Sequence, residues 1–217
     1  MKGGAIIIFA SAVLAAAGAW ALTMARPEAH ASPRAPVAVH APRDGDRNFL
    51  SQAQLREAIK SGTLDRPVKS LLAVKAPLRF GDYAWNERGV PDGPTWLRVD
   101  LRSQLISIFR AGHEIGTAVI VYGGDNKRTP AGMLHILGKA RDHRSSLYDA
   151  EMPYTLRLTE DGVSIHASSV RWGAATHGCI GVPPAFAERL FKATRLGDEV
   201  VVVGEPRRRP GERQSPA

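Results

Sequence analysis

The alternation of apolar and polar residues from Thr95 onward predicts a β-sheet. Residues 96–101 (WLRVDL) alternate, residues 102–103 form a tight turn, and residues 104–109 (QLISIF) and 115–122 (IGTAVIVY) supply two further strands. Strands joined by such short connections pair as hairpins. We therefore expect an antiparallel sheet at the centre of the fold.

Apolar segments later in the chain extend this pattern. Residues 133–137 and 200–203 are strand-like, and residues 156–158 and 163–166 are expected to form a hairpin that turns at Glu160-Asp161-Gly162. The fold class is therefore mainly β. About 110 residues, from 95 to 204, are enough for one hydrophobic core.

One or two helices accompany the strands. Ser51 is a plausible N-cap and Gly62 a plausible stop for a helix over about 51–61, in which apolar residues recur at helical spacing. A second helix begins at Pro183-Pro184, because proline is favoured in a first helical turn, and ends at Gly197. Its apolar face is formed by Phe186, Leu190, Phe191 and Thr194.

The N-terminus has the composition of an export signal. Met1-Lys2 precedes an apolar run over residues 3–22, a positive start followed by the apolar stretch of a signal peptide. The run also approaches the roughly 20 residues that span a bilayer, and Ala29-His30-Ala31 offers a cleavage site. We expect residues 1–31 to be a signal peptide or an N-terminal membrane anchor; a buried core helix is the alternative. The folded part would then be periplasmic or in the cell envelope, either secreted or anchored.

The remaining segments outside the sheet differ in composition. Residues 32–47 are rich in proline and alanine and are interpreted as a linker. Residues 48–94 contain the first helix and many turn signals, which predicts a helical and irregular lead-in. Residues 205–217 are predicted to be a basic, disordered tail.

The chain is basic, with a formal net charge of +8. Residues 1–31 contribute +1, from Lys2 and Arg26 against Glu28, which leaves +7 on the remainder. A basic surface attracts polyanions. Outside the cytoplasm these are cell-wall polymers and lipid headgroups, so no nucleic-acid partner is expected.

Cys179 is the only cysteine, so it cannot form an internal disulfide. An exported protein is usually in an oxidising compartment, and an odd cysteine there suggests intermolecular pairing or a reactive thiol. A buried, inert cysteine is the ordinary alternative. Its position beside histidine and glycine in a turn favours a reactive thiol.

Two histidines are candidates for the base that activates Cys179. A thiolate is the nucleophilic form of cysteine, and a neighbouring imidazole can take the proton and hold an ion pair. His166 ends a strand thirteen residues before Cys179, and His177 lies two residues before it. We favour His166, because a base on a rigid strand is better positioned. The ion pair would hold the thiol pKa well below its ordinary value of about 8.5.

The turn itself offers oxyanion donors. Gly178 permits tight backbone geometry, and the amides of Gly178 and Cys179 are candidates to face a developing oxyanion. A zinc site is the competing use of a cysteine with two histidines, but it would need a further ligand, and the chain has no second cysteine. We therefore expect no metal and no cofactor.

These residues match a known family. Residues 164–166 (SIH) followed by 176–180 (THGCI) resemble the catalytic signature of the L,D-transpeptidase (YkuD-type) family. Residues 128–132 (RTPAG) resemble its Thr-Pro-x-Gly turn. The resemblance covers about residues 95–204 and implies a YkuD-like β-sandwich or barrel.

The resemblance also implies a reaction. Cys179 would attack the carbonyl of the L-centre of diaminopimelate in a peptidoglycan stem peptide, expel the terminal D-alanine and form a thioester. The amine of a second stem peptide would resolve it into a 3-3 cross-link. His166 would serve as the base, His177 and Gly178 would shape the oxyanion site, and Thr176 would support the turn.

The chain departs from the family at two positions. Ala167 stands where the family usually has glycine, and Gly181 stands where it usually has arginine. Arg171 or Arg144 would be the substitute if that arginine binds a substrate carboxylate. Arg171 and Trp172 are therefore candidate substrate contacts, with an exposed charge and a packing aromatic as the alternative. His135 and His143 are interpreted as structural.

Three functions remain open from the sequence. The leading hypothesis is an L,D-transpeptidase of cell-wall biogenesis. A peptidoglycan L,D-carboxypeptidase or endopeptidase of the same fold would use water to resolve the thioester. A wall-binding module that retains the fold with an idle thiol is the non-catalytic alternative.

Overall fold

The computed structural model describes residues 47–124, 127–145, 150–171, 174 and 176–204, all within one of the two units of the chain, Ala35–Ala217. The expected signal or anchor, nearly all of the linker, and the C-terminal tail lie outside the described residues. Within the described residues, no helix has both the length and the apolar character needed to cross a membrane.

The predicted central hairpins are confirmed. Strands β4 (Thr95–Asp100), β5 (Leu105–Arg110) and β6 (His113–Val119) pair antiparallel in chain order. Leu97 pairs with Ile108, and both side chains are fully buried. Alternate residues of a strand face the same side of the sheet, and this side faces the core.

The sheet continues on both sides of this centre. Strand β12 (Glu199–Val203) lies parallel to β4, and β7 (Gly132–His135) lies antiparallel to β12. The full order is β1-β2-β6-β5-β4-β12-β7, with β3 paired to β6.

The lead-in is more regular than its sequence indicated. It contains the predicted helix, α1 (Gln52–Lys60), whose N-cap Ser51 and residue Gln54 form a reciprocal capping box. It also contributes three short strands to the main sheet, namely β1 (Arg47–Phe49), β2 (Ser70–Leu72) and β3 (Tyr83–Trp85). Segments of three residues are too short to show alternation, so their pairing partners determine their conformation.

A second sheet has the order β11-β10-β9-β8. The predicted hairpin is confirmed, since β9 (Thr155–Arg157) pairs antiparallel with β10 (Ser164–Ala167). Strands β8 (Gly138–Ala140) and β11 (Ile180–Val182) were not predicted. Strand β11 follows Cys179 directly and lies parallel to β10, a pairing that no local pattern reveals.

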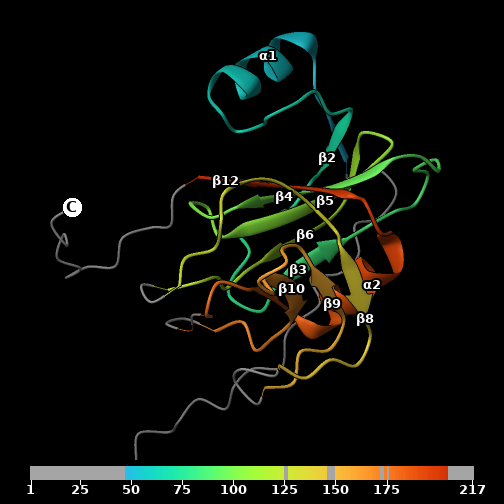
Figure 1. The fold of residues 1–217 in the computed structure, drawn as a ribbon. Helices are drawn as coiled ribbons and strands as arrows, with labels where there is room; N and C mark the ends of the chain where they lie inside the picture. The colour runs from blue at the N-terminus through green and yellow to red at the C-terminus, as the bar shows by residue number, and fades with distance from the viewer. Residues whose placement is uncertain (1–46, 125–126, 146–149, 172–173, 175, 205–217) are drawn as a thin grey trace, which may run out of the picture. The chain divides into compact units, whose positions relative to one another are not determined.

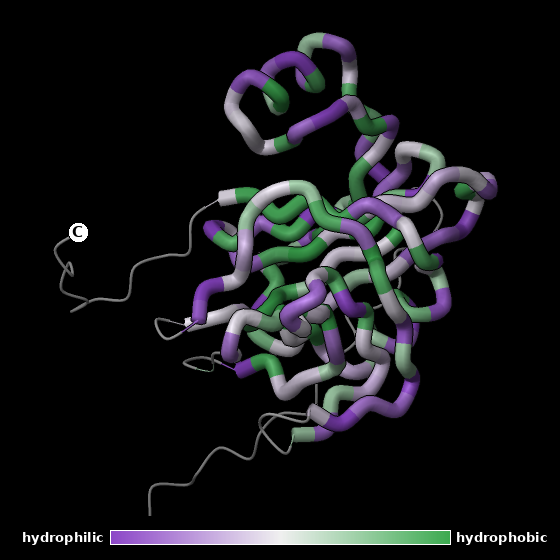
Figure 2. Tube along the Cα trace, in the orientation of Figure 1, coloured by the Kyte–Doolittle hydropathy of each residue, from purple (hydrophilic) through white to green (hydrophobic). Residues whose placement is uncertain are grey.

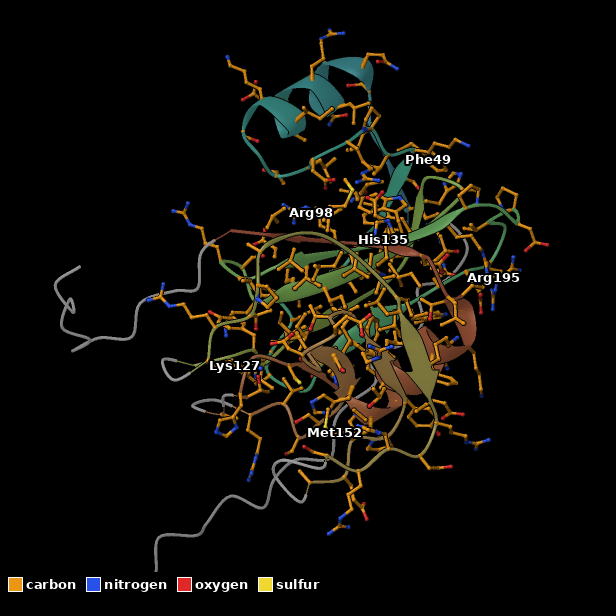
Figure 3. All side chains as sticks on the ribbon, in the orientation of Figure 1. Phe49, Arg98, Lys127, His135, Met152 and Arg195 are labelled. Carbon is orange, nitrogen blue, oxygen red and sulfur yellow. The ribbon has the colours of Figure 1, made fainter. Side chains whose placement is uncertain are left out.

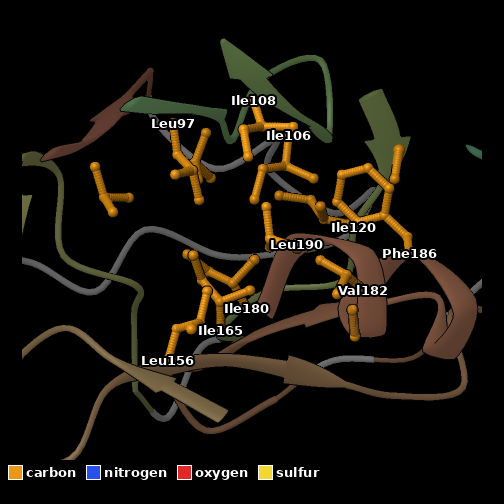
Figure 4. Close-up of a cluster of buried hydrophobic side chains, with 14 of the residues drawn as sticks. Leu97, Ile106, Ile108, Ile120, Leu156, Ile165, Ile180, Val182, Phe186 and Leu190 are labelled. Atoms are coloured by element: carbon orange, nitrogen blue, oxygen red, sulfur yellow. The ribbon is translucent and has the colours of Figure 1, made fainter. Parts of the chain in front are cut away.

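The two sheets and helix α2 (Pro184–Ala193) share one core (Figure 1). Figure 4 shows Leu97, Ile106 and Ile108 of the main sheet across this core from residues of the second sheet. Hydrophobic residues are concentrated in these central strands, as Figure 2 shows. The fold is therefore mainly β with two helices, as predicted.

Candidate active site

The parallel pairing of β10 and β11 places Cys179 on the same side of the sheet as His166. His166 pairs with Gly181 and Ile165 with Ile180, so Cys179 comes level with Ser164. Residues two apart on a strand face the same side of a sheet. The side chains of Cys179 and His166 therefore face the same side, and both line one cavity.

Cys179 is half-buried, and its Sγ lies 3.8 Å from the carbonyl oxygen of Gly162. Burial raises the pKa of the thiol above its ordinary value; the backbone amide of Ser164 and the charge of Lys127 lower it, and Asp161 raises it further. The net shift is upward, which is opposite to the thiolate expected from the sequence. The resting thiol is therefore protonated at neutral pH.

His166 is held in one tautomer. Its side chain is buried, and its Nδ1 lies 2.9 Å from the carbonyl oxygen of Ala167. A carbonyl only accepts hydrogen bonds, so Nδ1 carries the proton and Nε2 is the acceptor nitrogen. Burial lowers the pKa of His166. The hydrogen bond to Ala167 raises this pKa and the charge of His143 lowers it, and the net shift is downward. The imidazole is therefore neutral at neutral pH and able to accept a proton.

Thr129 of the Thr-Pro-x-Gly turn anchors the turn that carries Cys179. Its Oγ1 donates to the carbonyl oxygen of Gly178 at 2.9 Å and accepts from the amide of Gly123 at 2.9 Å. Gly178 has a φ of +96°, in the region that favours glycine. One buried hydroxyl thus joins two backbone segments beneath Cys179.

Thr176 anchors the same turn from its other end. Its Oγ1 donates to the carbonyl oxygen of Cys179, and its amide donates to the carbonyl oxygen of Tyr122 at 3.0 Å. A Cβ on Gly123 would lie 2.7 Å from the Cα of Gly178, so glycine permits this close approach. The supporting role that the resemblance gave Thr176 agrees with these contacts.

The anchoring fixes the direction of one amide. In a trans peptide the C=O and the following N–H point in opposite directions. Because the carbonyl of Gly178 points to Thr129, the N–H of Cys179 points away from Thr129. The orientation of this amide, a candidate oxyanion donor, is therefore set before substrate binds.

The cavity that contains Cys179 has a volume of about 440 Å³. Four of the predicted site residues, Cys179, His166, His177 and Thr176, line it. Gly178, a fifth, is buried within the turn and does not line the cavity. Figure 3 shows two of the other lining side chains, Lys127 and Met152, beside the second sheet. The other described residues that line it are His143, Ser145, Ala150, Glu160, Asp161, Gly162 and Val163.

One of the predicted substrate contacts is not brought into the cavity. Arg171 is exposed and is not among the described residues that line it. Trp172 lies outside the described residues. Conversely, Lys127 and His143 both line the cavity. The sequence did not mark Lys127 as a site residue, and it led us to interpret His143 as structural. The only sequence signal for Lys127 is its place two residues before Thr129.

Gly181 is a point of close approach between strands. A Cβ there would lie 2.7 Å from the Cβ of Ser168 and 2.7 Å from Cγ2 of Val121. A side chain at position 181 would therefore clash with the packed side chains of Ser168 and Val121. Arg144, the other suggested substitute for the family arginine, forms an exposed ion pair with Glu151 at 3.9 Å.

The described residues contain no group of three or more His, Cys, Asp or Glu side chains arranged to hold a metal ion. A larger cavity, of about 1150 Å³, lies between the lead-in and the outer face of the main sheet. Neither Cys179 nor His166 lines it. Both candidate catalytic residues line the smaller cavity instead.

Comparison with known proteins gives a consistent result. Residues 94–202, half of the chain, match the family model described as YkuD, L,D-transpeptidase catalytic domain. L,D-transpeptidase 1 of Mycobacterium tuberculosis is 28% identical over 121 residues, which are 48% of this chain and 48% of that protein. The matched region thus spans about half the length of this curated relative.

Solved structures with a similar fold include two L,D-transpeptidases. The one from Stackebrandtia nassauensis has a TM-score of 0.49 and 24% identity, covering 54% of this chain and 58% of that chain. The one from Mycobacterium smegmatis has a TM-score of 0.48 and 20% identity, covering 51% and 58% respectively.

Proposed function

The chain belongs to the YkuD family of L,D-transpeptidase catalytic domains, and on that premise we propose that it is a cysteine acyltransferase that forms 3-3 cross-links between peptidoglycan stem peptides. Cys179 is the nucleophile and His166 the general base. The observation that supports this proposal most directly is the β10–β11 register, which places both side chains on one side of the sheet and on one cavity.

The first half-reaction forms a thioester. Sγ of Cys179 bonds to the carbonyl carbon of the L-centre of diaminopimelate, and Nε2 of His166 accepts the thiol proton. The amide of Cys179 donates to the oxyanion, because its direction is fixed by Thr129. The bond to the terminal D-alanine then breaks, and His166 returns the proton to the departing amine.

The second half-reaction reverses these roles. The side-chain amine of diaminopimelate in a second stem peptide attacks the thioester carbonyl. His166 accepts a proton from that amine and returns it to Sγ as the C–S bond breaks. The products are a 3-3 cross-linked dimer and the free thiol.

The raised pKa of Cys179 and the lowered pKa of His166 favour a neutral pair before substrate binds. Proton transfer therefore accompanies attack on the carbonyl. A protonated resting thiol is also less prone to oxidation than a thiolate. Such protection suits the oxidising cell envelope, where we propose that the protein acts, either secreted or anchored through residues 1–31.

The test uses defined stem peptides. The full chain is incubated with a tetrapeptide donor alone and with an added acceptor stem, and the products are separated by mass. Dimers linked 3-3 support transfer to an amine. Tripeptide monomers as the only product would identify a carboxypeptidase, and unchanged tetrapeptide would point to a wall-binding module.

A further inference from the structure

An ion pair stands on the wall of the catalytic cavity. Nζ of Lys127 lies 3.1 Å from Oδ2 of Asp161, and both residues line the cavity. Both side chains reach solvent, with 39% of Lys127 and 65% of Asp161 exposed. Because the pair is exposed, breaking it to admit other charges costs little.

The two charges flank the nucleophile. Cγ of Lys127 lies 3.3 Å from the position that a Cβ would take on Gly178, so the lysine stem crosses the residue before Cys179. Asp161 precedes Gly162, whose carbonyl oxygen lies 3.8 Å from Sγ of Cys179. Both charges are also close enough to Cys179 to shift its pKa in opposite directions. The pair thus joins the segments on either side of the thiol.

The arginine that the family usually has near the cysteine is replaced by Gly181 in this chain. Position 181 has no space for a side chain, since Ser168 and Val121 fill it. Arg171 does not line the cavity, whereas Lys127 does. Lys127 therefore brings a full positive charge to the wall of the site.

We propose that Lys127 and Asp161 form a recognition site for a zwitterionic amino-acid centre on the acyl donor, with Lys127 binding its carboxylate and Asp161 its ammonium group. This inference rests on the proposed function, because the D-centre of diaminopimelate carries these two groups a few bonds from the attacked carbonyl. A lysine side chain carries the ammonium group without the carboxylate. The pair would therefore select diaminopimelate over lysine in the stem.

Charge complementarity supports this assignment. In the free protein each charge neutralises the other, and a bound zwitterion would complete an array of four alternating charges. A charge-assisted hydrogen bond is stronger than a neutral one. A donor with only one of the two charges would leave Lys127 or Asp161 without its new partner.

The experiment measures binding without turnover. Dissociation constants are determined by calorimetry for the full chain carrying Cys179→Ala, with and without Lys127→Met, which keeps the apolar stem over Gly178. The ligands are the diaminopimelate tetrapeptide and the same peptide with its D-centre carboxylate amidated. Lys192→Met is the matched control, because Lys192 forms an exposed ion pair with Glu188 at 2.6 Å on α2.

Lys127→Met is expected to weaken binding of the unmodified peptide about 10- to 100-fold and of the amidated peptide less than about threefold. Lys192→Met leaves both unchanged. Equal weakening of both peptides would overturn the inference, because Lys127 would then bind only the terminal carboxylate. Unchanged binding of the unmodified peptide would also overturn it. If the predicted pattern holds but Cys179 of the unaltered chain forms no thioester, the proposed function fails and the recognition site stands.

Discussion

Thr129 and Gly178 are joined by a buried hydrogen bond of 2.9 Å, which ties the turn that carries Cys179 to the Thr-Pro-x-Gly turn forty-nine residues earlier. The same hydroxyl accepts from the amide of Gly123. The position of Cys179, the proposed nucleophile, and the direction of its amide therefore depend on a side chain that does not line the cavity. Thr129 is a positioning residue.

Thr129→Val should destabilise the protein and slow acylation. Valine keeps the shape but leaves the carbonyl of Gly178 and the amide of Gly123 buried without a partner, at a cost of about 2 to 4 kcal/mol. Because the turn then shifts, kcat/KM for thioester formation should fall about 10- to 100-fold. Urea denaturation and stopped-flow acylation measure the two effects. Thr129→Ser keeps the hydroxyl and should retain most of both; equal loss in both variants would contradict this role.

The acid limb of the pH profile should lie below the ordinary histidine value. His166 must be neutral to accept the thiol proton, so activity is lost as pH falls through its pKa. Burial lowers that pKa, which places the limb in kcat/KM below about pH 6.5.

His143→Gln should move the same limb to higher pH. The charge of His143 lowers the pKa of His166, and glutamine removes that charge. His135→Gln is the control, because His135 is exposed on β7. An acid limb that His143→Gln leaves in place would show that another group controls it.

Gly181→Ala should destabilise the protein, because position 181 has no space for a side chain. The new methyl group would overlap Ser168 and Val121, and overpacking of this kind costs about 1 to 3 kcal/mol. Adding Ser168→Gly removes one of the two clashes, so the double variant should recover part of the loss. A Gly181→Ala variant as stable as the unaltered chain would mean that β11 can move away from its neighbours.

The sequence predicts those parts of the fold whose pattern is local. Alternation over residues 96–122 predicts β4 to β6, and Ser51 predicts the start of α1. Strand β11 was missed because three residues containing a glycine become a strand only by pairing in parallel with β10.

The same distinction applies to the site. The sequence predicted Cys179 and His166 as partners from a motif with a thirteen-residue gap, and both line one cavity. Lys127 was not predicted, because no local pattern reveals that its stem lies against Gly178, a residue far along the chain. The direction of the thiol pKa shift also depends on burial, which the sequence does not give.

Intact-mass measurement of the acyl-enzyme tests the central claim most directly. The full chain is mixed with a diaminopimelate tetrapeptide donor and quenched in acid, alongside Cys179→Ala and His166→Ala. We predict a thioester adduct equal in mass to the donor minus D-alanine, located at Cys179. It should be absent in Cys179→Ala and should form about 100- to 10,000-fold more slowly in His166→Ala. An unmodified chain, or an adduct that forms equally fast in His166→Ala, would contradict the account.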